Sequence, residues 1–250
     1  HYLHRRQRQM CIRDRFFRDQ ELSPEAHLDF AKKWGPINVN RFFTPVEGYP
    51  SIAEVRKEPH QQYNIGGNWH TDHSYDQIPA LGSMLYAKEL PKVGGDTLFA
   101  GCAAAFDTLS EGMKSTLRSL RAVHSSRHVF GKSAAIPDDM ADLFGNADKA
   151  LQDAEHPVVI KHPLSGRETL YVNPGFTTRF VGWTEKESNS LLAFLYEHIS
   201  RPEHTYRFQW SKGALAFWDN RATWHLAVND YPGETRLMHR ITIEGEPLEP

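Results

Sequence analysis

Cysteine is scarce in this sequence, and long apolar runs are missing. Only Cys11 and Cys102 occur among the 250 residues, too few for a disulfide framework, so a reducing cytoplasm is the expected compartment. No apolar stretch approaches the roughly 20 residues of a membrane-spanning helix, and no apolar segment of a secretory signal follows the basic N-terminus. We therefore expect a cytoplasmic protein with no membrane partner.

An excess of charge of one sign is also missing. The 29 basic and 31 acidic residues give a formal net charge of -2, so we expect no nucleic-acid partner. Apolar residues make up 40% of the chain, which supports a core, and the length fits one large domain. Aromatic residues reach 12%, which suits either a β-rich fold with an aromatic-lined pocket or simply a well-filled core.

The first 15 residues differ from the rest of the chain. They hold five arginines and show neither helical nor strand periodicity. The string Met10–Arg15 resembles translated sequencing-adaptor sequence, and a basic targeting arm is the alternative. We therefore expect residues 1–15 to be a non-native or disordered segment and residues 16–250 to form a single domain.

Two segments carry strong helix signals. Ser23 followed by Pro24 predicts a helix that continues to about Lys33, and Thr184–Ile199 begins with a capping box formed by Thr184 and Glu187. Helix signals also cover residues 103–122. Residues 38–66 resemble a loop with short extended pieces, and residues 125–155 resemble a flexible insertion or lid.

Short strands separated by turn signals predict a β-sandwich or barrel for most of the remainder. These strands are expected at Ser83–Glu89, Thr97–Ala100, Pro157–His162, Glu168–Val172, Tyr206–Trp210, Ala214–Trp218, Thr223–Val228 and Arg236–Ile243.

A His-x-Asp pattern, which suits metal binding, occurs twice. His27 and Asp29 fall in a predicted helix, where positions two apart diverge by about 200°, so we interpret both as solvated. His70 and Asp72 precede a strand, and in an extended segment such positions share a face and can ligate one ion. This pattern alone is weak, because short His-x-Asp strings are common.

A third candidate ligand, His225, lies in the strand Thr223–Val228. If this strand and Arg236–Ile243 form a symmetric hairpin, Arg236 stands opposite His225. Arg240 then faces the same side as Arg236, because their separation is even. An inward-facing arginine needs an anion and is well suited to a carboxylate.

Two histidines and one carboxylate match the facial triad of non-haem iron(II) oxygenases. Three coordination positions then stay open, two for a chelating 2-oxoglutarate and one for O₂. Zinc also accepts these ligands, so a zinc-dependent hydrolase is one alternative. It predicts a His-Glu-x-x-His helix or a general base beside the metal, and neither is evident. A non-catalytic cupin-like metal- or ligand-binding protein is the other alternative.

Five segments together carry a family resemblance. They are Asn68–Asp72, Gly94–Thr97, Val172–Arg179, Phe217–His225 and Arg236–Arg240. From about Phe16 to Glu244 the sequence resembles the taurine dioxygenase family of iron(II)- and 2-oxoglutarate-dependent dioxygenases.

The resemblance implies a mainly β fold with helical insertions, a double-stranded β-helix or jelly roll. It implies His70, Asp72 and His225 as iron(II) ligands, and Thr97 and Arg236 as the residues that bind the distal carboxylate of 2-oxoglutarate. The implied reaction hydroxylates a small anionic organic substrate, taurine-like, alkylsulfonate-like or a carboxylate, with decarboxylation of 2-oxoglutarate to succinate and CO₂. A homodimer is typical of the resemblance, and a higher homo-oligomer is the alternative.

The resemblance also implies two substrate-binding residues, Arg240 for an anionic group and Phe176 in the pocket wall. From the residues alone, Arg240 could instead be a structural ion-pair partner and Phe176 plain core. Thr97 could likewise be an ordinary strand residue. We expect the determinants of specificity in residues 125–155 and in the loop before His70.

The sequence departs from the family pattern at several points. Gly66 stands where taurine-specific members carry a substrate-contacting Asn, which argues against taurine, and Trp224 stands where a Gln is common. The family usually has some tens of residues before Phe16, so we expect an N-terminally truncated domain. We expect His239 to face away from the site and Arg221 to pair with Asp219.

Overall fold

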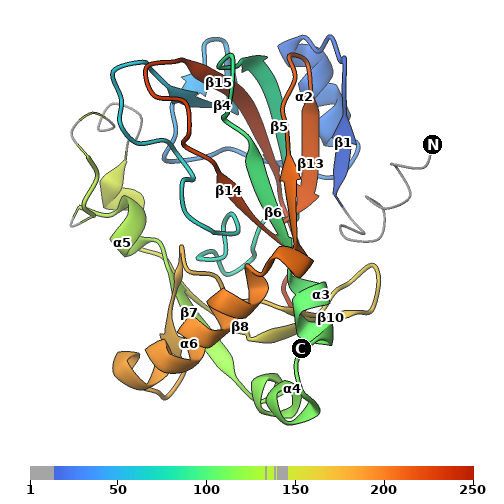
Figure 1. The fold of residues 1–250 in the computed structure, drawn as a ribbon, viewed down its shortest axis with the longest axis vertical. Helices are drawn as coiled ribbons and strands as arrows, with labels where there is room; N and C mark the ends of the chain where they lie inside the picture. The colour runs from blue at the N-terminus through green and yellow to red at the C-terminus, as the bar shows by residue number, and fades with distance from the viewer. Residues whose placement is uncertain (1–13, 133, 138, 140–145) are drawn as a thin grey trace.

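The computed structural model describes residues 14–132, 134–137, 139 and 146–250, in which strand exceeds helix. Seven strands form the larger sheet, in the upper half of Figure 1: β1 (Arg15–Phe17), β2 (Ile37–Asn38), β3 (Pro45–Val46), β4 (Tyr49–Lys57), β5 (Gly82–Glu89), β13 (Leu215–Asp219) and β15 (Arg236–Ile243). Their hydrogen-bonded order is β1-β13-β5-β15-β4-β3, with β2 paired to β15, and every pairing is antiparallel.

A second, three-stranded sheet packs against one face of the larger sheet. It has the order β12-β6-β14 and consists of β12 (Thr205–Phe208), β6 (Thr97–Gly101) and β14 (Thr223–Ala227). The buried cluster between the two sheets combines Phe99 and Phe208 of the smaller sheet with Leu85, Trp218 and Met238 of the larger one. Four of the candidate site residues, Thr97, His225, Arg236 and Arg240, are therefore carried by two sheets that enclose a common core.

The opposite face of the larger sheet is buried as well. Helix α2 (Pro24–Lys32) contributes Ala31 to a cluster with Met84, Tyr86 and Ile241. Because side chains alternate along a strand, Met84 and Tyr86 face α2 while Leu85 faces the smaller sheet. A strand buried on both faces explains why residues 82–87 are all buried.

The lower half of the molecule packs helices against short strands (Figure 1). It contains α3 (Cys102–Asp107), α4 (Glu111–Arg118), β7 (Arg121–Ser125), α5 (Arg127–Phe130), η2 (Ala147–Lys149), β8 (Asp153–Pro157), β9 (Val159–Lys161), β10 (Glu168–Leu170), β11 (Thr177–Phe180), α6 (Glu185–Ile199) and η3 (Pro202–His204). The strands form a β11-β7-β8 sheet and a β10-β9 hairpin. Leu192 and Leu195 of α6 join Phe106, Phe180 and Trp224 in the core of this half.

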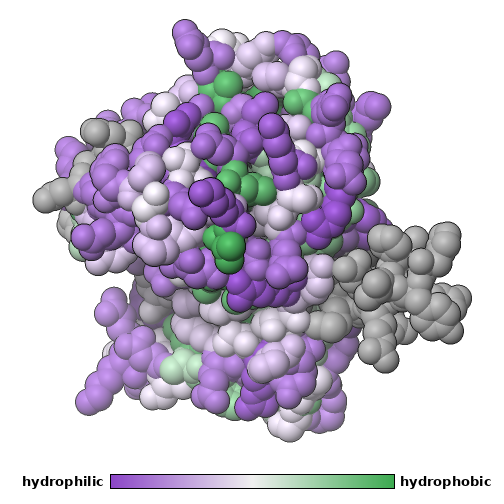
Figure 2. All heavy atoms as spheres, turned by 45° about the horizontal axis from the view of Figure 1, so that its top comes forward, coloured by the Kyte–Doolittle hydropathy of each residue, from purple (hydrophilic) through white to green (hydrophobic). Residues whose placement is uncertain are grey.

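None of the helices in the described ranges is long and apolar enough to span a membrane. On the face shown in Figure 2 hydrophilic residues dominate, and apolar side chains gather only in small groups. Few apolar side chains are therefore exposed to solvent on this face.

Both capped helices form as predicted. Ser23 accepts a hydrogen bond from the backbone N–H of Ala26 at the start of α2, and Thr184 and Glu187 form the capping box of α6. The predicted strands also form, each within a few residues of its expected bounds.

The helix signals in residues 103–122 are confirmed as two helices, because Thr108 ends α3 and the hydroxyl of Ser110 caps α4. Two local predictions were wrong. Residues 38–66 include β4, a nine-residue strand, and not only loop. His27 is buried on the inner face of α2, where its ring lies 6.0 Å from that of Tyr86, and is not solvated.

The predicted hairpin of β14 and β15 was also wrong. Strand β14 pairs with β6, so His225 lies opposite Phe99, whereas β15 pairs with β4 and β5, so Arg236 lies opposite Lys57. The connection between them crosses from one sheet to the other. Asp230 in this connection accepts hydrogen bonds from Gly95 N–H and from the Arg207 side chain. These contacts hold the connection against other segments, and it does not form a tight hairpin turn.

Of the segment 1–15 that was predicted to be non-native or disordered, residues 1–13 lie outside the described residues. Asp14 and Arg15 already belong to the fold, since Arg15 pairs with Phe217 and Asp14 accepts a hydrogen bond from Thr223. Within residues 125–155, α5, η2 and the start of β8 are ordered elements, while 133, 138 and 140–145 lie outside the described ranges.

Candidate active site

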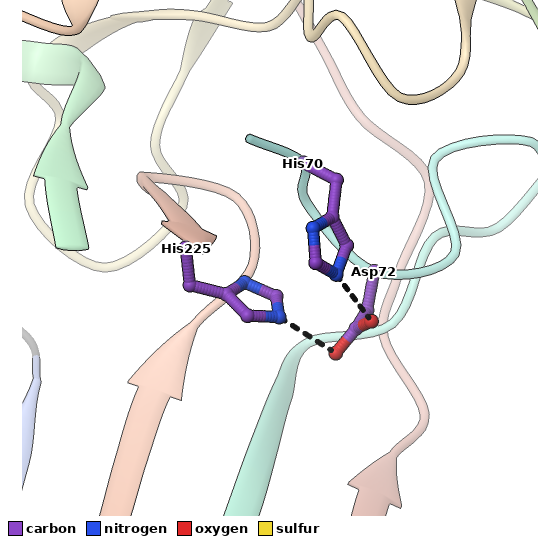
Figure 3. A group of neighbouring side chains, drawn as sticks. All are labelled: His70, Asp72 and His225. Carbon is purple, nitrogen blue, oxygen red and sulfur yellow. Dashed lines mark ion pairs between the residues drawn. The ribbon is translucent and has the colours of Figure 1, made fainter. Parts of the chain in front are cut away.

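His70, Asp72 and His225 meet at the edge of β14 (Figure 3). His70 and His225 form an antiparallel bridge with reciprocal backbone hydrogen bonds of 3.1 and 2.8 Å, which holds their rings 4.1 Å apart. Asp72 follows two residues later, and its carboxylate oxygens lie 3.8 Å from each of the two Nε2 atoms. Three donor atoms within 4.8 Å of one another form the predicted triad.

The hydrogen bonds around the triad suit a divalent metal ion. His70 Nδ1 lies 2.7 Å from the carbonyl oxygen of Asn68, which assigns the ring proton to Nδ1 and leaves the Nε2 lone pair for a metal. Asp72 Oδ2 accepts a hydrogen bond from Ser83 Oγ at 2.7 Å, and Ser83 in turn accepts one from Asn220 at 3.2 Å. The donor set and its supports therefore fit iron(II) with open coordination positions.

The electrostatics of the triad also favour metal binding. Burial lowers the pKa of His70 and of His225, so both imidazoles are neutral near pH 7. Burial works to raise the pKa of Asp72, but the Arg240 guanidinium and the neighbouring imidazoles hold it below its ordinary value. Two neutral imidazoles and one carboxylate are the protonation states that a metal ion requires.

Thr97 and Arg236 lie together on the inner side of the sheets. Thr97 is two residues from Phe99, the strand partner of His225, so Thr97 and His225 share a face of the smaller sheet. Arg236 reaches this point from the larger sheet, where Nε donates to Gly95 O at 3.0 Å and Nη2 lies 3.5 Å from Thr97 Oγ1. The structure thus brings the two predicted residues together without the hairpin that was used to place Arg236.

The Arg236 guanidinium is a buried cation. Its side chain is 3% exposed, and within the described part of the chain no carboxylate forms an ion pair with it. Burying an unpaired guanidinium is unfavourable, so this position is built for an external anion.

Two glycines shape the approach to Arg236. Gly94 and Gly95 both adopt positive φ, 85° and 70°. A Cβ on Gly94 would lie 2.4 Å from Asp230 Oδ1, and one on Gly95 would lie 3.2 Å from Arg236 Cδ. The glycines therefore allow the loop to contact both Asp230 and Arg236 through its backbone.

A pocket of about 890 Å³ opens beside the triad. Its lining includes His70, Asp72 and Arg240 and comes mainly from the two predicted segments, the loop before His70 and the 125–155 region. Aromatic and aliphatic side chains dominate the wall: Phe43, Tyr63, Ile65, Trp69, Tyr75, Val129, Phe130, Ile136, Phe176 and Leu226. Thr97 and Arg236 are not among the lining residues.

Both predicted substrate residues lie at this pocket. Arg240 Nη1 donates to Asp72 Oδ1 at 3.2 Å, and its guanidinium carbon lies 4.6 Å from the Phe43 ring centroid. Phe176 lines the wall and packs against Tyr75 with ring centroids 4.8 Å apart, so it belongs both to the pocket and to a buried cluster. Arg240 therefore also forms the ion pair that the alternative interpretation expected, and its partner is Asp72 of the triad.

Several contributors were not predicted from the sequence. Ser83 and Asn220 form the support of Asp72, and although Asn220 lies within the segment Phe217–His225, the sequence did not indicate this role for either residue. His73 Nδ1 lies 2.9 Å from Asp76 Oδ2, and its Nε2 is buried without a partner among the described residues. From its position next to Asp72 in the sequence, His73 is expected to support the site or to lie at the surface rather than to be a fourth ligand, and its burial fits the supporting role. The predicted pair of Arg221 with Asp219 is present at 2.8 Å.

Comparison with known proteins connects this geometry to a family. The sequence profile described as "Taurine catabolism dioxygenase TauD, TfdA family" matches residues 15–242. The chain belongs to this family. It is an iron(II)- and 2-oxoglutarate-dependent dioxygenase that uses O₂, as predicted, and the zinc-hydrolase and cupin-like alternatives are set aside.

Individual relatives cover nearly the whole chain. The "Alkylsulfatase" of Acinetobacter baylyi is 35% identical over 235 residues, 92% of this chain and 73% of that protein. The "Alpha-ketoglutarate-dependent sulfate ester dioxygenase" of Pseudomonas putida is 34% identical over 236 residues, with coverage of 92% and 76%. A solved taurine dioxygenase from Burkholderia xenovorans aligns with a TM-score of 0.77 at 34% identity and covers 94% of this chain and 77% of that one. This likeness confirms the predicted mainly β jelly-roll fold.

Proposed function

We propose that this TauD/TfdA-family enzyme hydroxylates small organic anions with an apolar body. His70, Asp72 and His225 bind iron(II), Thr97 and Arg236 bind the distal carboxylate of 2-oxoglutarate, and Arg240 with Phe176 binds the substrate. The observation that supports this assignment most strongly is the position of two buried guanidinium groups near one open triad. Arg236 has no acidic partner in the described residues, and Arg240 lines the pocket.

Bound iron(II) would let O₂ oxidise two partners, with one oxygen atom going to succinate as 2-oxoglutarate loses CO₂ and the other hydroxylating a substrate C–H bond. The chain's own residues bind and orient. Asn68 and Ser83 fix the direction of His70 and Asp72. The apolar wall around Phe176 excludes water from the reacting centre, which limits unproductive side reactions.

The pocket favours an anion with an alkyl or aryl body. Arg240 uses only Nη1 in its hydrogen bonds to the described residues, so further N–H donors stay available for a sulfate, sulfonate or carboxylate group. A Cβ at Gly66 would lie 3.1 Å from His70 Cε1, so a side chain here would press on the triad. The names of the two sulfate-ester relatives support an anionic substrate. We therefore place alkyl sulfates and aryloxyalkanoates ahead of taurine.

Anaerobic titration of the purified protein with iron(II) and 2-oxoglutarate tests the assignment. A weak visible charge-transfer band is expected when the 2-oxo acid chelates the iron. A folded, iron-loaded protein that gives no band would remove the proposed cofactor site.

Replacing Arg240 with glutamine is expected to weaken binding of anionic substrates by about 10- to 100-fold, because one charge-assisted hydrogen-bonded contact is lost. The KM for an alkyl sulfate, measured by succinate release, checks this expectation. The KM for the 2-oxo acid co-substrate is expected to change little and is the internal control. A parallel rise in both KM values would instead indicate general damage to the site.

A cytoplasmic location is inferred from the low cysteine content. Assembly into a homodimer or a higher homo-oligomer stays a prediction.

A further inference from the structure

The hydroxyl of Thr97 lies between two hydrogen-bond donors. Trp210 Nε1 donates to Thr97 Oγ1 at 3.0 Å, and Arg236 Nη2 lies 3.5 Å from the same oxygen. An indole N–H and a guanidinium can only donate, and a hydroxyl oxygen has two lone pairs and one hydrogen. Both lone pairs of Thr97 are therefore occupied, and its hydrogen must point toward some other acceptor.

That acceptor is not found within the described residues. Thr97 Oγ1 donates no hydrogen bond to any of them, and the residue is only 2% exposed, so bulk water does not satisfy it. A buried O–H without an acceptor is unfavourable. The hydroxyl is thus held ready for an acceptor that binds beside Arg236.

Trp210 also contacts Arg236. The guanidinium carbon of Arg236 lies 5.8 Å from the indole centroid, and the indole packs edge-on against Phe208 at 4.8 Å. Phe208 is the strand partner of Thr97, so one aromatic side chain connects the hydroxyl, the guanidinium and the strand beneath them.

We propose that Trp210 is a positioning residue, which makes the Thr97 hydroxyl a hydrogen-bond donor and so completes a two-donor cradle with Arg236. This rests on the proposed function, in which these two residues bind the distal carboxylate of 2-oxoglutarate. Without the indole N–H, the Thr97 hydrogen can turn toward other directions. The consequence is specificity: Trp210 favours 2-oxo acids that end in a second carboxylate over those that end in a methyl group.

The experiment compares two 2-oxo acids by anaerobic titration of the iron-loaded protein, with the charge-transfer band as readout. 2-Oxoglutarate carries the distal carboxylate, and 2-oxopentanoate has the same chain length without it. In Trp210→Phe, binding of 2-oxoglutarate is expected to weaken about tenfold, while binding of 2-oxopentanoate changes by less than about twofold. Trp210→Leu, which also lacks the N–H, is expected to behave alike, and Trp34→Phe, at a half-exposed tryptophan packed on Phe217, is the matched control.

A double-mutant comparison separates positioning from packing. In Thr97→Val the hydroxyl is gone, so adding Trp210→Phe is expected to weaken 2-oxoglutarate binding no further. The proposal is overturned if both 2-oxo acids weaken together, if neither changes, or if the two substitutions add. Absence of the band from the wild-type protein with 2-oxoglutarate would instead count against the proposed function as a whole.

Discussion

Asp72→Ala is expected to abolish iron(II) binding and also to destabilise the metal-free protein. Asp72 supplies the only carboxylate of the triad, so its loss leaves two imidazoles, which hold iron(II) weakly. The same carboxylate pairs with Arg240 at 3.2 Å, and both side chains are 7% exposed. Removing one partner of a buried ion pair leaves an uncompensated charge, which costs about 3 kcal/mol.

Two measurements check this prediction, iron binding by anaerobic titration and urea unfolding in the presence of a chelator. Asp72→Asn is the matched variant, since its amide oxygen can still accept from Arg240 and its NH₂ group can donate to Ser83 Oγ, but it removes the charge that a metal needs. It is expected to lose iron while retaining more stability than Asp72→Ala. Wild-type iron affinity in either variant would contradict the triad, and an unchanged urea midpoint in Asp72→Ala would contradict the role of the ion pair.

Local signals in the sequence were sufficient for the capped helices and for the spacing of most strands. Ser23 and Thr184 specify helix starts through contacts within three residues, so no tertiary information is needed. Residues 103–122 show the limit of such signals. Their helical pattern continues through Leu109, whereas the packing of α3 and α4 into one core requires a break there.

Strand pairing was not predictable in the same way. The turn residues Asn229–Glu234 suit a hairpin, yet β14 and β15 belong to different sheets. Which strands pair depends on contacts between distant segments, which local turn chemistry does not encode. The direction of Arg236 and Arg240 was nevertheless correct, because alternation along a strand is the same whichever neighbour it pairs with.

The residues of the candidate site also differ in whether local sequence signals or long-range contacts place them. His70 and Asp72 are two residues apart in an extended segment, so their common direction follows from local geometry. Ser83, Asn220 and Trp210 support the site from other strands and turns, and nothing near them in the sequence indicates their partners. Residues proposed to contact the ligands directly were accessible to sequence reasoning, whereas residues that hold them in place needed the fold.

Arg236→Gln is expected to weaken 2-oxoglutarate binding by about 100-fold or more and to leave iron affinity unchanged. The guanidinium is the buried cation beside Thr97, and a hydrogen bond that involves a charge contributes about 1.5–3 kcal/mol. Glutamine retains N–H donors but has a shorter side chain and no charge, so this variant removes both the charge and the reach of the guanidinium. Because Arg236 does not contact the triad, iron binding serves as the control for an intact site.

Arg236→Lys distinguishes charge from geometry at this position. Lysine keeps the positive charge but lacks the planar pair of N–H donors, so its affinity toward 2-oxoglutarate is expected to lie between those of the wild type and Arg236→Gln. A Lys variant as weak as the Gln variant would mean that geometry dominates, and one as strong as the wild type would mean that charge alone suffices. If Arg236→Gln binds 2-oxoglutarate as tightly as the wild type, the buried guanidinium serves another anion, and the assignment of Thr97 and Trp210 is lost with it.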